Sequence, residues 1–170
     1  MGDEPKKEAG NVDPQWEAMR AAAKRIDKVN EWLRLGGAIP REECHRLREA
    51  GITHVVDLRE EYQGAEEHLA SMGINRRHVP VSNFDPPTTE QLREVARWIE
   101  DKGGMACTYV HCGGGIGRAA TMAVALLAQS GIGLDAALRQ VREARPEIRI
   151  NDLQMEWLRT LEQSKDRTGG

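Results

Sequence analysis

The chain has 170 residues, a formal net charge of −3, and a composition that is 39 % hydrophobic and 30 % charged, which indicates one soluble globular domain. Because it has no large basic field, we expect no nucleic-acid partner. The longest apolar run, Met122–Ala128, is far shorter than the roughly 20 residues of a membrane-spanning helix, so we expect no stable membrane insertion.

The cysteines and the two ends of the chain suggest the location and the domain limits. The three cysteines are widely spaced and make no disulfide framework, so we expect a cytoplasmic protein with reduced thiols. A monomer is a separate expectation. Residues 1–13 are polar and lack the apolar core of a signal peptide, which predicts a disordered tail. A single catalytic domain over residues 14–164 and a flexible tail over residues 165–170 are predicted to follow.

Helix and strand patterns alternate along the first half of the domain. A helical period covers residues 14–33 and turns extended into residues 33–40. The elements predicted next are a helix at 41–51, a buried strand at 52–59, a helix at 63–73 and a strand at 75–81. Gly51 and Gly73 close the two helices, at the usual place for glycine after a helix C-terminus.

The second half continues with a helix, a strand and three helices. The predicted ranges are 88–104, 107–112, 117–131, 134–146 and 151–163. Capping boxes mark the start of the first and last of these helices, formed by Thr88 with Gln91 and by Asn151 with Gln154. The helix over 117–131 is apolar almost all round, which predicts a buried central position.

This alternation predicts an α/β fold with a mainly parallel central sheet of about 4–5 strands, flanked by helices on both faces. Ligands bind such sheets beyond the carboxyl ends of the strands. The stretch YVHCGGGIGRAAT, residues 109–121, lies at one of those ends, between a strand and the buried helix. We therefore expect the functional site there.

This stretch combines features that favour a tetrahedral anion. Free backbone N–H groups at a helix N-terminus bind anions, and Gly113, Gly114 and Gly115 allow successive N–H groups to converge on one point. Arg118 adds a bidentate guanidinium. The helix dipole and Arg118 favour the thiolate of Cys112, which is then placed for in-line attack on phosphorus. The G-K-[ST] sequence of a Walker loop is missing.

The sequence HCGGGIGR resembles the signature of the cysteine-dependent protein tyrosine phosphatase superfamily, in which His-Cys is followed by five residues and Arg. The segments LGGAIP, GITHVVDLRE, HVPVSNFDPPT and those from YVHC to NDLQMEWL are similar to its small, atypical dual-specificity branch. The likeness covers residues 33–161. It implies a tyrosine phosphatase-like fold and hydrolysis through a phosphocysteine intermediate, without a cofactor or a metal.

The resemblance also implies a role for each residue of the loop. Cys112 is the nucleophile, and His111 supports the loop through hydrogen bonds, because a thiolate that is already formed needs no base. An aspartate on another loop protonates the leaving oxygen and then activates water. The phosphoryl oxygens are bound by the side chain of Arg118 and by the backbone of Gly113, Gly114, Gly115, Ile116 and Gly117.

The general acid is the first departure from the family pattern. In many relatives the aspartate follows a proline and two further residues, where this chain has Asn83 after Pro80. An asparagine cannot donate a proton and recover it. We predict that Asp85, which precedes two prolines that fix its backbone, is the catalytic acid. The alternatives are that Asp85 is an ordinary turn residue and that catalysis is slow or limited to good leaving groups.

Ala119 is the second departure, because most relatives carry Ser or Thr after the arginine and use that hydroxyl when the intermediate is hydrolysed. Phosphatases of regenerating liver and plant glucan phosphatases also have Arg-Ala, so alanine does not exclude the family. We expect a slow second step and a long-lived phosphocysteine. Thr121 offers a nearby hydroxyl, but a threonine in this position more often bonds its own helix backbone.

Other residues near the stretch have both a structural and a functional interpretation. Cys107 lies about 16 Å from Cys112 along the predicted strand, so a small core residue is favoured over a resolving thiol. The end of an earlier strand offers residues that brace Arg118, line the rim or form structural salt bridges: Asp57, Arg59 and Glu60.

The loop composition bears on the substrate. No residue between Cys112 and Arg118 is basic, which disfavours multiply phosphorylated inositides, and Ile116 favours an apolar or aromatic substrate. A short domain predicts a shallow pocket, so we expect phosphotyrosine and phosphoserine or phosphothreonine in proteins, or a small phosphomonoester, as substrates. The alternatives are a lipid or carbohydrate monophosphate, a phosphate-binding pseudophosphatase with little turnover, and a rhodanese-like sulfurtransferase.

Overall fold

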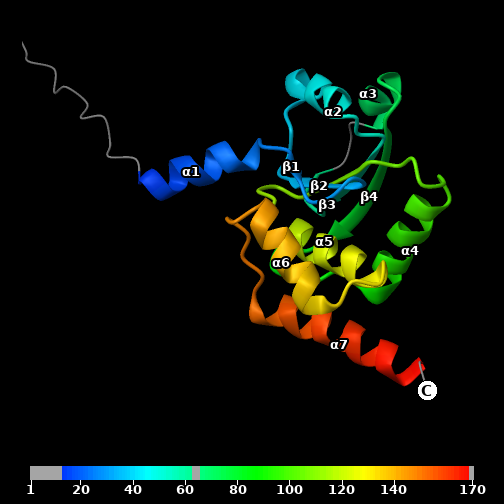
Figure 1. Ribbon diagram of the computed structural model, residues 1–170. Helices are drawn as coiled ribbons and strands as arrows, with labels where there is room; N and C mark the ends of the chain where they lie inside the picture. Colours follow the sequence, from blue (N-terminus) through cyan, green and yellow to red (C-terminus); the bar gives the residue numbers. More distant parts are fainter. Residues whose placement is uncertain (1–12, 63–65, 169–170) are drawn as a thin grey trace, which may run out of the picture.

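The structure, a computed structural model, describes residues 13–62 and 66–168. These residues form a five-stranded sheet with helices on both faces (Figure 1), which confirms the predicted α/β fold. The predicted disordered tail over residues 1–13 lies outside the described residues, apart from Asp13, whose carboxylate accepts a hydrogen bond from the Gln15 N–H and caps the first helix. Residues 63–65 of the helix predicted at 63–73 lie outside them as well.

The elements follow one another along the chain in nearly the predicted order. The helices are α1 (Pro14–Ala23), α2 (His45–Glu49, preceded by a 3₁₀ turn at Arg41–Glu43), α3 (Glu66–Ser71), α4 (Thr89–Glu100), α5 (Arg118–Gln129), α6 (Leu134–Ala144) and α7 (Asp152–Thr168). The strands are β1 (Asp27–Lys28), β2 (Leu33–Gly36), β3 (His54–Arg59), β4 (Asn75–Val81) and β5 (Thr108–His111).

Two predicted boundaries are wrong. The helix predicted over residues 14–33 ends at Ala23, because the chain then enters strands in which Leu33 and Leu35 are fully buried, and burial outweighs local helix propensity. The final helix continues to Thr168, so residues 165–168 of the predicted flexible tail are helical. Lys165 and Arg167 lie in its last turn, where cations interact favourably with the helix dipole.

The order of the strands brings four connecting loops to one edge of the sheet. The order is β1-β2-β5-β3-β4, and only β1 runs antiparallel to its neighbour within the described sheet. Gly36 and Asp57 both pair with His111, so β2, β5 and β3 end at the same level. The segments after β2, β3, β4 and β5 therefore meet beyond this edge, where a ligand binds in such sheets.

The two faces of the sheet carry separate cores because strand side chains alternate. Val56, Leu58 and Val110 pack with α4, α5, α6 and α7 in the larger core, and Val55 and Tyr109 pack with α2 and α3 in the smaller one. Figure 1 shows these two groups of helices on opposite sides of the sheet, with α1 projecting away from the rest. Helix α5 is buried along most of its length, as predicted.

Candidate active site

The loop of residues 112–117 lies between β5 and α5, and its carbonyl groups are held from outside. Each carbonyl from residue 113 to residue 117 accepts a hydrogen bond from a donor beyond the loop. The donors are the N–H of Ala38 for Gly113, Arg145 Nη2 for Gly114, Arg145 Nε for Gly115, the N–H of Arg149 for Ile116, and the N–H and Oγ1 of Thr121 for Gly117.

This arrangement fixes the direction of the loop N–H groups. In a trans peptide the N–H points away from the carbonyl of the preceding residue, so carbonyls held outward turn the next N–H groups inward. The N–H of Gly115 lies 3.3 Å from Cys112 Sγ. The loop is therefore a ring of inward N–H donors around the cysteine sulfur, which is the geometry of an anion-binding nest.

Gly115 has a backbone that requires glycine. Its φ is +69°, and a Cβ atom at this position would lie 2.3 Å from the carbonyl carbon of Gly36. Any side chain would therefore collide with the backbone of β2 as well as strain the loop. The close packing of the loop on the end of β2 is possible only with this residue.

Arg145 is the main support of the loop, and the sequence analysis missed it. Its side chain is fully buried and donates to the two loop carbonyls named above, to the carbonyl of Ala22 at 2.8 Å and to the carboxylate of Asp27 at 2.9 Å. A buried arginine needs such partners. Because Asp27 lies 118 residues away, no local pattern points to the pair; the only signal is an arginine placed where Pro146 ends a helical pattern.

Cys112 forms the floor of the nest and is buried. Helix α5 begins directly behind it at Arg118, and Gly117 at its N-cap supplies no capping side chain. The first N–H groups of α5 are therefore open to an anion, and the positive end of the helix dipole lies at this loop. The sulfur, the N–H ring and the helix end together suit attack on a bound phosphoryl group.

Arg118 is held by Glu61, a second residue that the sequence analysis missed. Nη1 and Nη2 of Arg118 each lie 2.8 Å from a Glu61 carboxylate oxygen, and Nη1 also donates to the carbonyl of Val81 at 3.0 Å. The hydrogen bonds from Arg118 lower the pKa of Glu61 to about 2, and those to Glu61 raise the pKa of Arg118. Nε of Arg118 has no partner among the described residues, so this edge of the guanidinium stays available to a phosphate.

The residues proposed from the sequence as braces of Arg118 have other partners. Asp57 accepts hydrogen bonds from Arg59 and Arg76, and Glu60 accepts one from Ser82. Burial alone would raise the pKa of Asp57, but these arginines and the nearby His111 outweigh it and hold that pKa well below its usual range. The brace is the next residue along the chain, Glu61, and a second glutamate after the strand was the available signal.

His111 donates from Nδ1 to the carbonyl of Cys112 at 3.1 Å, which is consistent with a loop-supporting role. Burial lowers the pKa of His111 to about 4. Asp57 lies 3.9 Å from its Nε2, but the charge of this carboxylate is already balanced by two arginines, so the opposing effect is weaker. The imidazole is neutral at physiological pH and is no proton donor to the reaction.

The segment after β4 carries Asn83 and Asp85, and the side chains of both are exposed. A turn closes over residues 82–85 through a hydrogen bond from the Asp85 N–H to the Ser82 carbonyl. Phe84 occupies this turn with a φ of +71° and is 72 % exposed. A non-glycine residue in this region is strained by about 1 kcal/mol or more, and such strain is typical of functional loops.

The N-terminus of α7 joins this turn to the loop of residues 112–117. Asn151 and Gln154 form the predicted reciprocal capping box, and each also has a second function. The Asn151 amide donates to the carbonyl of Phe84 at 2.8 Å, and Gln154 Nε2 donates to that of Asp85 at 3.3 Å. Gln154 also packs beside Gly117, where an added Cβ would lie 3.5 Å from its Nε2. The side chain of Asp85 is thus carried by a turn adjacent to the loop.

Three further sequence-based expectations concern residues around the loop. Thr121 uses its hydroxyl to bond the carbonyl of Gly117 within its own helix, as expected. Ala119 is fully buried and offers no hydroxyl to the sulfur. Cys107 is a free thiol at the opposite end of β5, and burial raises its pKa, which fits the structural interpretation.

Residues 13–62 and 66–168 also bear on membrane crossing and on metal binding. No helix there combines the length and the apolar composition that a bilayer crossing needs. No group of three or more His, Cys, Asp or Glu side chains in the same residues is arranged to hold a metal ion.

Comparisons with known proteins agree with this geometry. A profile of the family described as PTP-SAK (Swiss Army Knife protein, DSP-PTPase phosphatase domain) matches residues 33–169. Mouse dual specificity protein phosphatase 19 is 31 % identical over 153 residues, which is 86 % of this chain and 66 % of the relative. Phosphatidylglycerophosphate phosphatase PTPMT2 of Arabidopsis thaliana is 25 % identical over 133 residues, 75 % of this chain and 58 % of the relative.

The chain thus spans less than two thirds of the length of these curated relatives. Among solved structures, Tk-PTP in its active form superposes with a TM-score of 0.73 at 31 % identity, covering 81 % of this chain and 96 % of that one. Because the family profile covers most of the chain and the nest with its cysteine and arginine lies within it, this protein belongs to the DSP-PTPase family of cysteine-dependent phosphatases.

Proposed function

We propose that this protein removes phosphate from phosphotyrosine and phosphoserine or phosphothreonine side chains of proteins, through a phosphocysteine intermediate. The observation that supports this most strongly is the ring of inward N–H groups above Cys112, with the Nε edge of Arg118 beside it. Donors fixed before the substrate arrives stabilise the charge of the transition state without reorganisation.

The proposed reaction has two steps. The Cys112 thiolate attacks phosphorus, the bond to the leaving oxygen breaks, and Asp85 gives that oxygen its proton. Water then attacks the phosphocysteine, Asp85 takes a proton from the water, and the sulfur leaves as the thiolate while orthophosphate forms. Arg118 and the N–H groups of residues 113–118 hold the three equatorial oxygens in both steps. Glu61 acts as a positioning residue that orients Arg118.

Phosphoproteins are favoured as substrates by the neutrality and the openness of the site. The loop residues between Cys112 and Arg118 are four glycines and an isoleucine, so the loop itself offers one phosphate its backbone N–H groups and Arg118, and no lysine for a second phosphate. The turn that carries Asp85 is exposed, which leaves room for phosphorylated side chains of different lengths.

A lipid monophosphate is the second candidate. Phe84 is 72 % exposed and Leu153 is 52 % exposed, and the hydrogen bond from Asn151 to the Phe84 carbonyl brings the first turn of α7, which carries Leu153, next to the turn that carries Phe84. Such a rim suits an acyl chain as well as an aromatic ring. The similarity to the plant phosphatidylglycerophosphate phosphatase adds support to this candidate.

The test is turnover of three substrates by the purified chain: a phosphotyrosine peptide, a phosphoserine peptide, and phosphatidylglycerophosphate in vesicles. We expect release of phosphate from both peptides at higher kcat/KM than from the lipid, and no release by Cys112→Ser. A higher kcat/KM for the lipid favours the second candidate. Phosphate binding without turnover of any substrate would identify a pseudophosphatase and refute the proposal.

The acid is tested by pH–rate profiles of aryl phosphate hydrolysis with burst kinetics. We expect Asp85→Asn to lower kcat on the order of 10²-fold and to remove the basic limb of the profile. Asp101→Asn, on an exposed aspartate at the far end of α4, is the matched control and keeps the profile. A silent Asp85→Asn together with faster turnover in Asn83→Asp would instead show that the native chain lacks its acid.

A further inference from the structure

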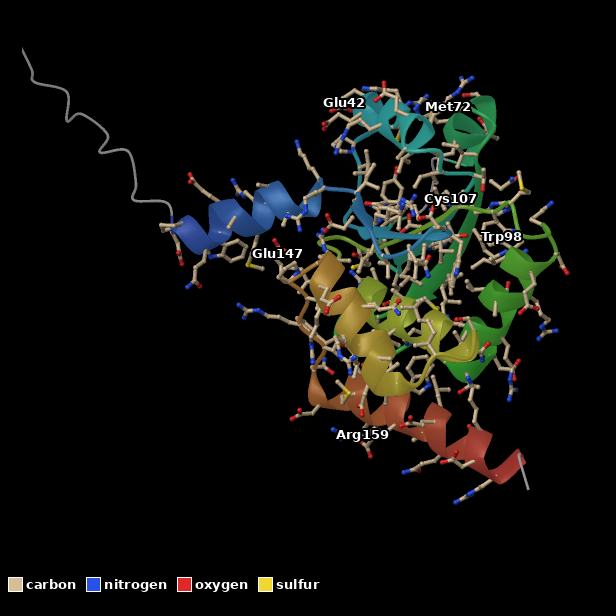
Figure 2. The ribbon with its side chains drawn as sticks, viewed as in Figure 1. Glu42, Met72, Trp98, Cys107, Glu147 and Arg159 are labelled. Carbon is tan, nitrogen blue, oxygen red and sulfur yellow. The ribbon has the colours of Figure 1, made fainter. Side chains whose placement is uncertain are left out.

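A cavity of about 380 Å³ lies on the face of the sheet opposite α5, between the sheet and helices α2 and α3. This volume is within the range of small-molecule sites, roughly 300–1,000 Å³. Glu42, labelled in Figure 2 beside α2, is at its outer side. The apolar part of its lining comes from both the helices and the sheet: Ile39, Leu47, Val55, Leu69, Tyr62 and Tyr109.

His111 offers this cavity a hydrogen-bond acceptor that has no partner. The side chains of Tyr109 and His111 lie on the same face of β5, which is the face toward α2 and α3, because residues two apart in a strand share a face. His111 therefore lines the cavity. The residue is only 6 % exposed. Nδ1 is used by the Cys112 carbonyl, whereas Nε2 has no hydrogen-bond partner among the described residues. Nε2 is not fully buried, so an occupant of the cavity that carries a donor can reach it.

Arg59 offers the same cavity a charged donor. Its Nε and Nη2 are bound by Asp57, and its guanidinium lies over the ring of Tyr62, 3.9 Å from the centroid. Nη1 has no hydrogen-bond partner within residues 13–62 and 66–168 and can donate. This free edge of the Arg59 guanidinium favours an occupant with an anionic group.

We propose that this cavity binds a small apolar carboxylic acid that also carries a hydroxyl group, and that its occupancy is coupled to the catalytic loop through His111. The carboxylate accepts from Arg59, the hydroxyl donates to His111 Nε2, and the apolar body lies among the aliphatic and tyrosine side chains. No bond of the ligand is made or broken. The binding does not depend on the proposed function.

The coupling follows from the two nitrogens of one ring. A donor on Nε2 fixes the proton on Nδ1, and Nδ1–H is the group that holds the Cys112 carbonyl. An occupant therefore stabilises the loop conformation that surrounds the sulfur. By reciprocity, an anion in the loop strengthens binding in the cavity by the same factor.

The probe is 4-hydroxybenzoate, with benzoate as the analogue without the hydroxyl and phenol as the analogue without the carboxylate. Binding to the full chain is measured by calorimetry, and its place by the ¹⁵N resonances of the His111 ring. We expect 4-hydroxybenzoate to bind about 10-fold more tightly than either analogue. Equal affinities for all three, no saturable binding at millimolar concentration, or shifts confined to the amides of residues 113–117 would overturn the proposal.

His111→Asn separates the two functions of the ring, because its amide nitrogen can still donate to the Cys112 carbonyl while the shorter side chain has no acceptor at the position of Nε2. We expect it to bind 4-hydroxybenzoate no better than benzoate. His45→Asn, on an exposed histidine of α2 outside the cavity lining, is the matched control and binds as the wild type. Wild-type affinity in His111→Asn contradicts the site, and thermal melting of both variants checks their folding.

The coupling has a readout that needs no phosphatase activity. The readout is the rate at which iodoacetamide alkylates Cys112, followed by peptide mass spectrometry. In the wild type this rate should change at least about 5-fold when 4-hydroxybenzoate saturates the cavity. In His111→Asn the rate should not respond to 4-hydroxybenzoate. Binding with an unchanged alkylation rate refutes the coupling. A chain that binds the probe but hydrolyses no phosphate ester would refute the proposed function alone.

Discussion

Two regions meet at the same edge of the sheet but are held in different ways: the loop of residues 112–117, called here the phosphate-binding loop, and the turn of residues 82–85, called the acid turn because it carries the proposed acid. All five carbonyls from Gly113 to Gly117 have donors outside the loop, and its central glycine packs directly on β2. The turn at residues 82–85 is exposed, contains a strained Phe84 and is joined to α7 by two side-chain donors. A preorganised anion site is thus combined with a turn, carrying the proposed acid Asp85, whose position depends on a few contacts.

The largest effect should follow from removing the support of the rigid region. Arg145→Met leaves two loop carbonyls and the Ala22 carbonyl without their donor, and Asp27 keeps only its pair with Arg25. Because each buried acceptor without a donor costs about 1–3 kcal/mol, we expect a loss of about 3–5 kcal/mol in the free energy of unfolding. Urea melts measure it. Arg142→Met, on the exposed side of α6, is the control and should melt within about 0.5 kcal/mol of wild type. A stable Arg145→Met with full activity would show that the loop does not need outward carbonyl donors.

A smaller effect concerns the pH dependence of the same region. The folded-state pKa of His111, about 4, lies below its ordinary value of 6.5, so the unfolded chain binds this proton first. The contribution of His111 to stability is therefore present above pH 6.5 and is lost as the pH falls toward 4, by about 2 kcal/mol between pH 7 and pH 5. When the pH falls from 7 to 5, the free energy of unfolding of the wild type should therefore decrease by about 2 kcal/mol more than that of His111→Asn. Urea melts of both proteins at both pH values measure this difference. Parallel pH dependences would contradict the assigned burial.

The acid turn should respond to a change that leaves the rigid region intact. Asn151→Ser keeps an N-cap side chain but is too short to reach the Phe84 carbonyl. We expect unchanged melting and a several-fold lower kcat for phenyl phosphate, whose poor leaving group needs the acid, with little change for p-nitrophenyl phosphate. Equal losses for both substrates would place the effect on phosphate binding instead. Asn151→Ala also removes the cap. Comparing it with Asn151→Ser therefore separates the effect on stability from the effect on the position of Asp85.

The smallest effect should come from the strain in that turn. Phe84→Gly removes an unfavourable positive φ, so we expect the chain to gain up to about 1 kcal/mol in stability. The same change frees the turn, and the kcat for phenyl phosphate should fall. Thermal melting and steady-state kinetics on one sample check both results. A destabilised variant would show that the exposed ring makes contacts that outweigh the strain.

The sequence was sufficient for features that depend on local pattern. Both capping boxes, the parallel strands and the glycine-rich connection to the buried helix are where periodicity and turn residues predicted them. The end of the first helix was not predictable in this way, because the burial of Leu33 and Leu35 in the sheet decides it.

The residues of the candidate site also fall into those that a local pattern predicts and those that it does not. Cys112, Arg118 and the glycines form one continuous motif and could be proposed from the sequence. Glu61 and Arg145 could not, since Glu61 reaches Arg118 over 57 residues and Arg145 meets Asp27 over 118. Such pairs exist only once the sheet has brought its loops together, and the roles of Asp85 and Asn83 remain predictions for kinetics to decide.

The contacts of Arg145 with Ala22 and Asp27 also bear on where a shortened form of this protein can begin. The family match starts at residue 33, so a chain cut at that boundary would keep every residue of the signature. It would nevertheless lose the carboxylate and the helix-end carbonyl that position the arginine beneath the loop. We therefore expect the smallest fragment with an ordered anion site to extend N-terminal to residue 22, one short strand and a helix end beyond the family match.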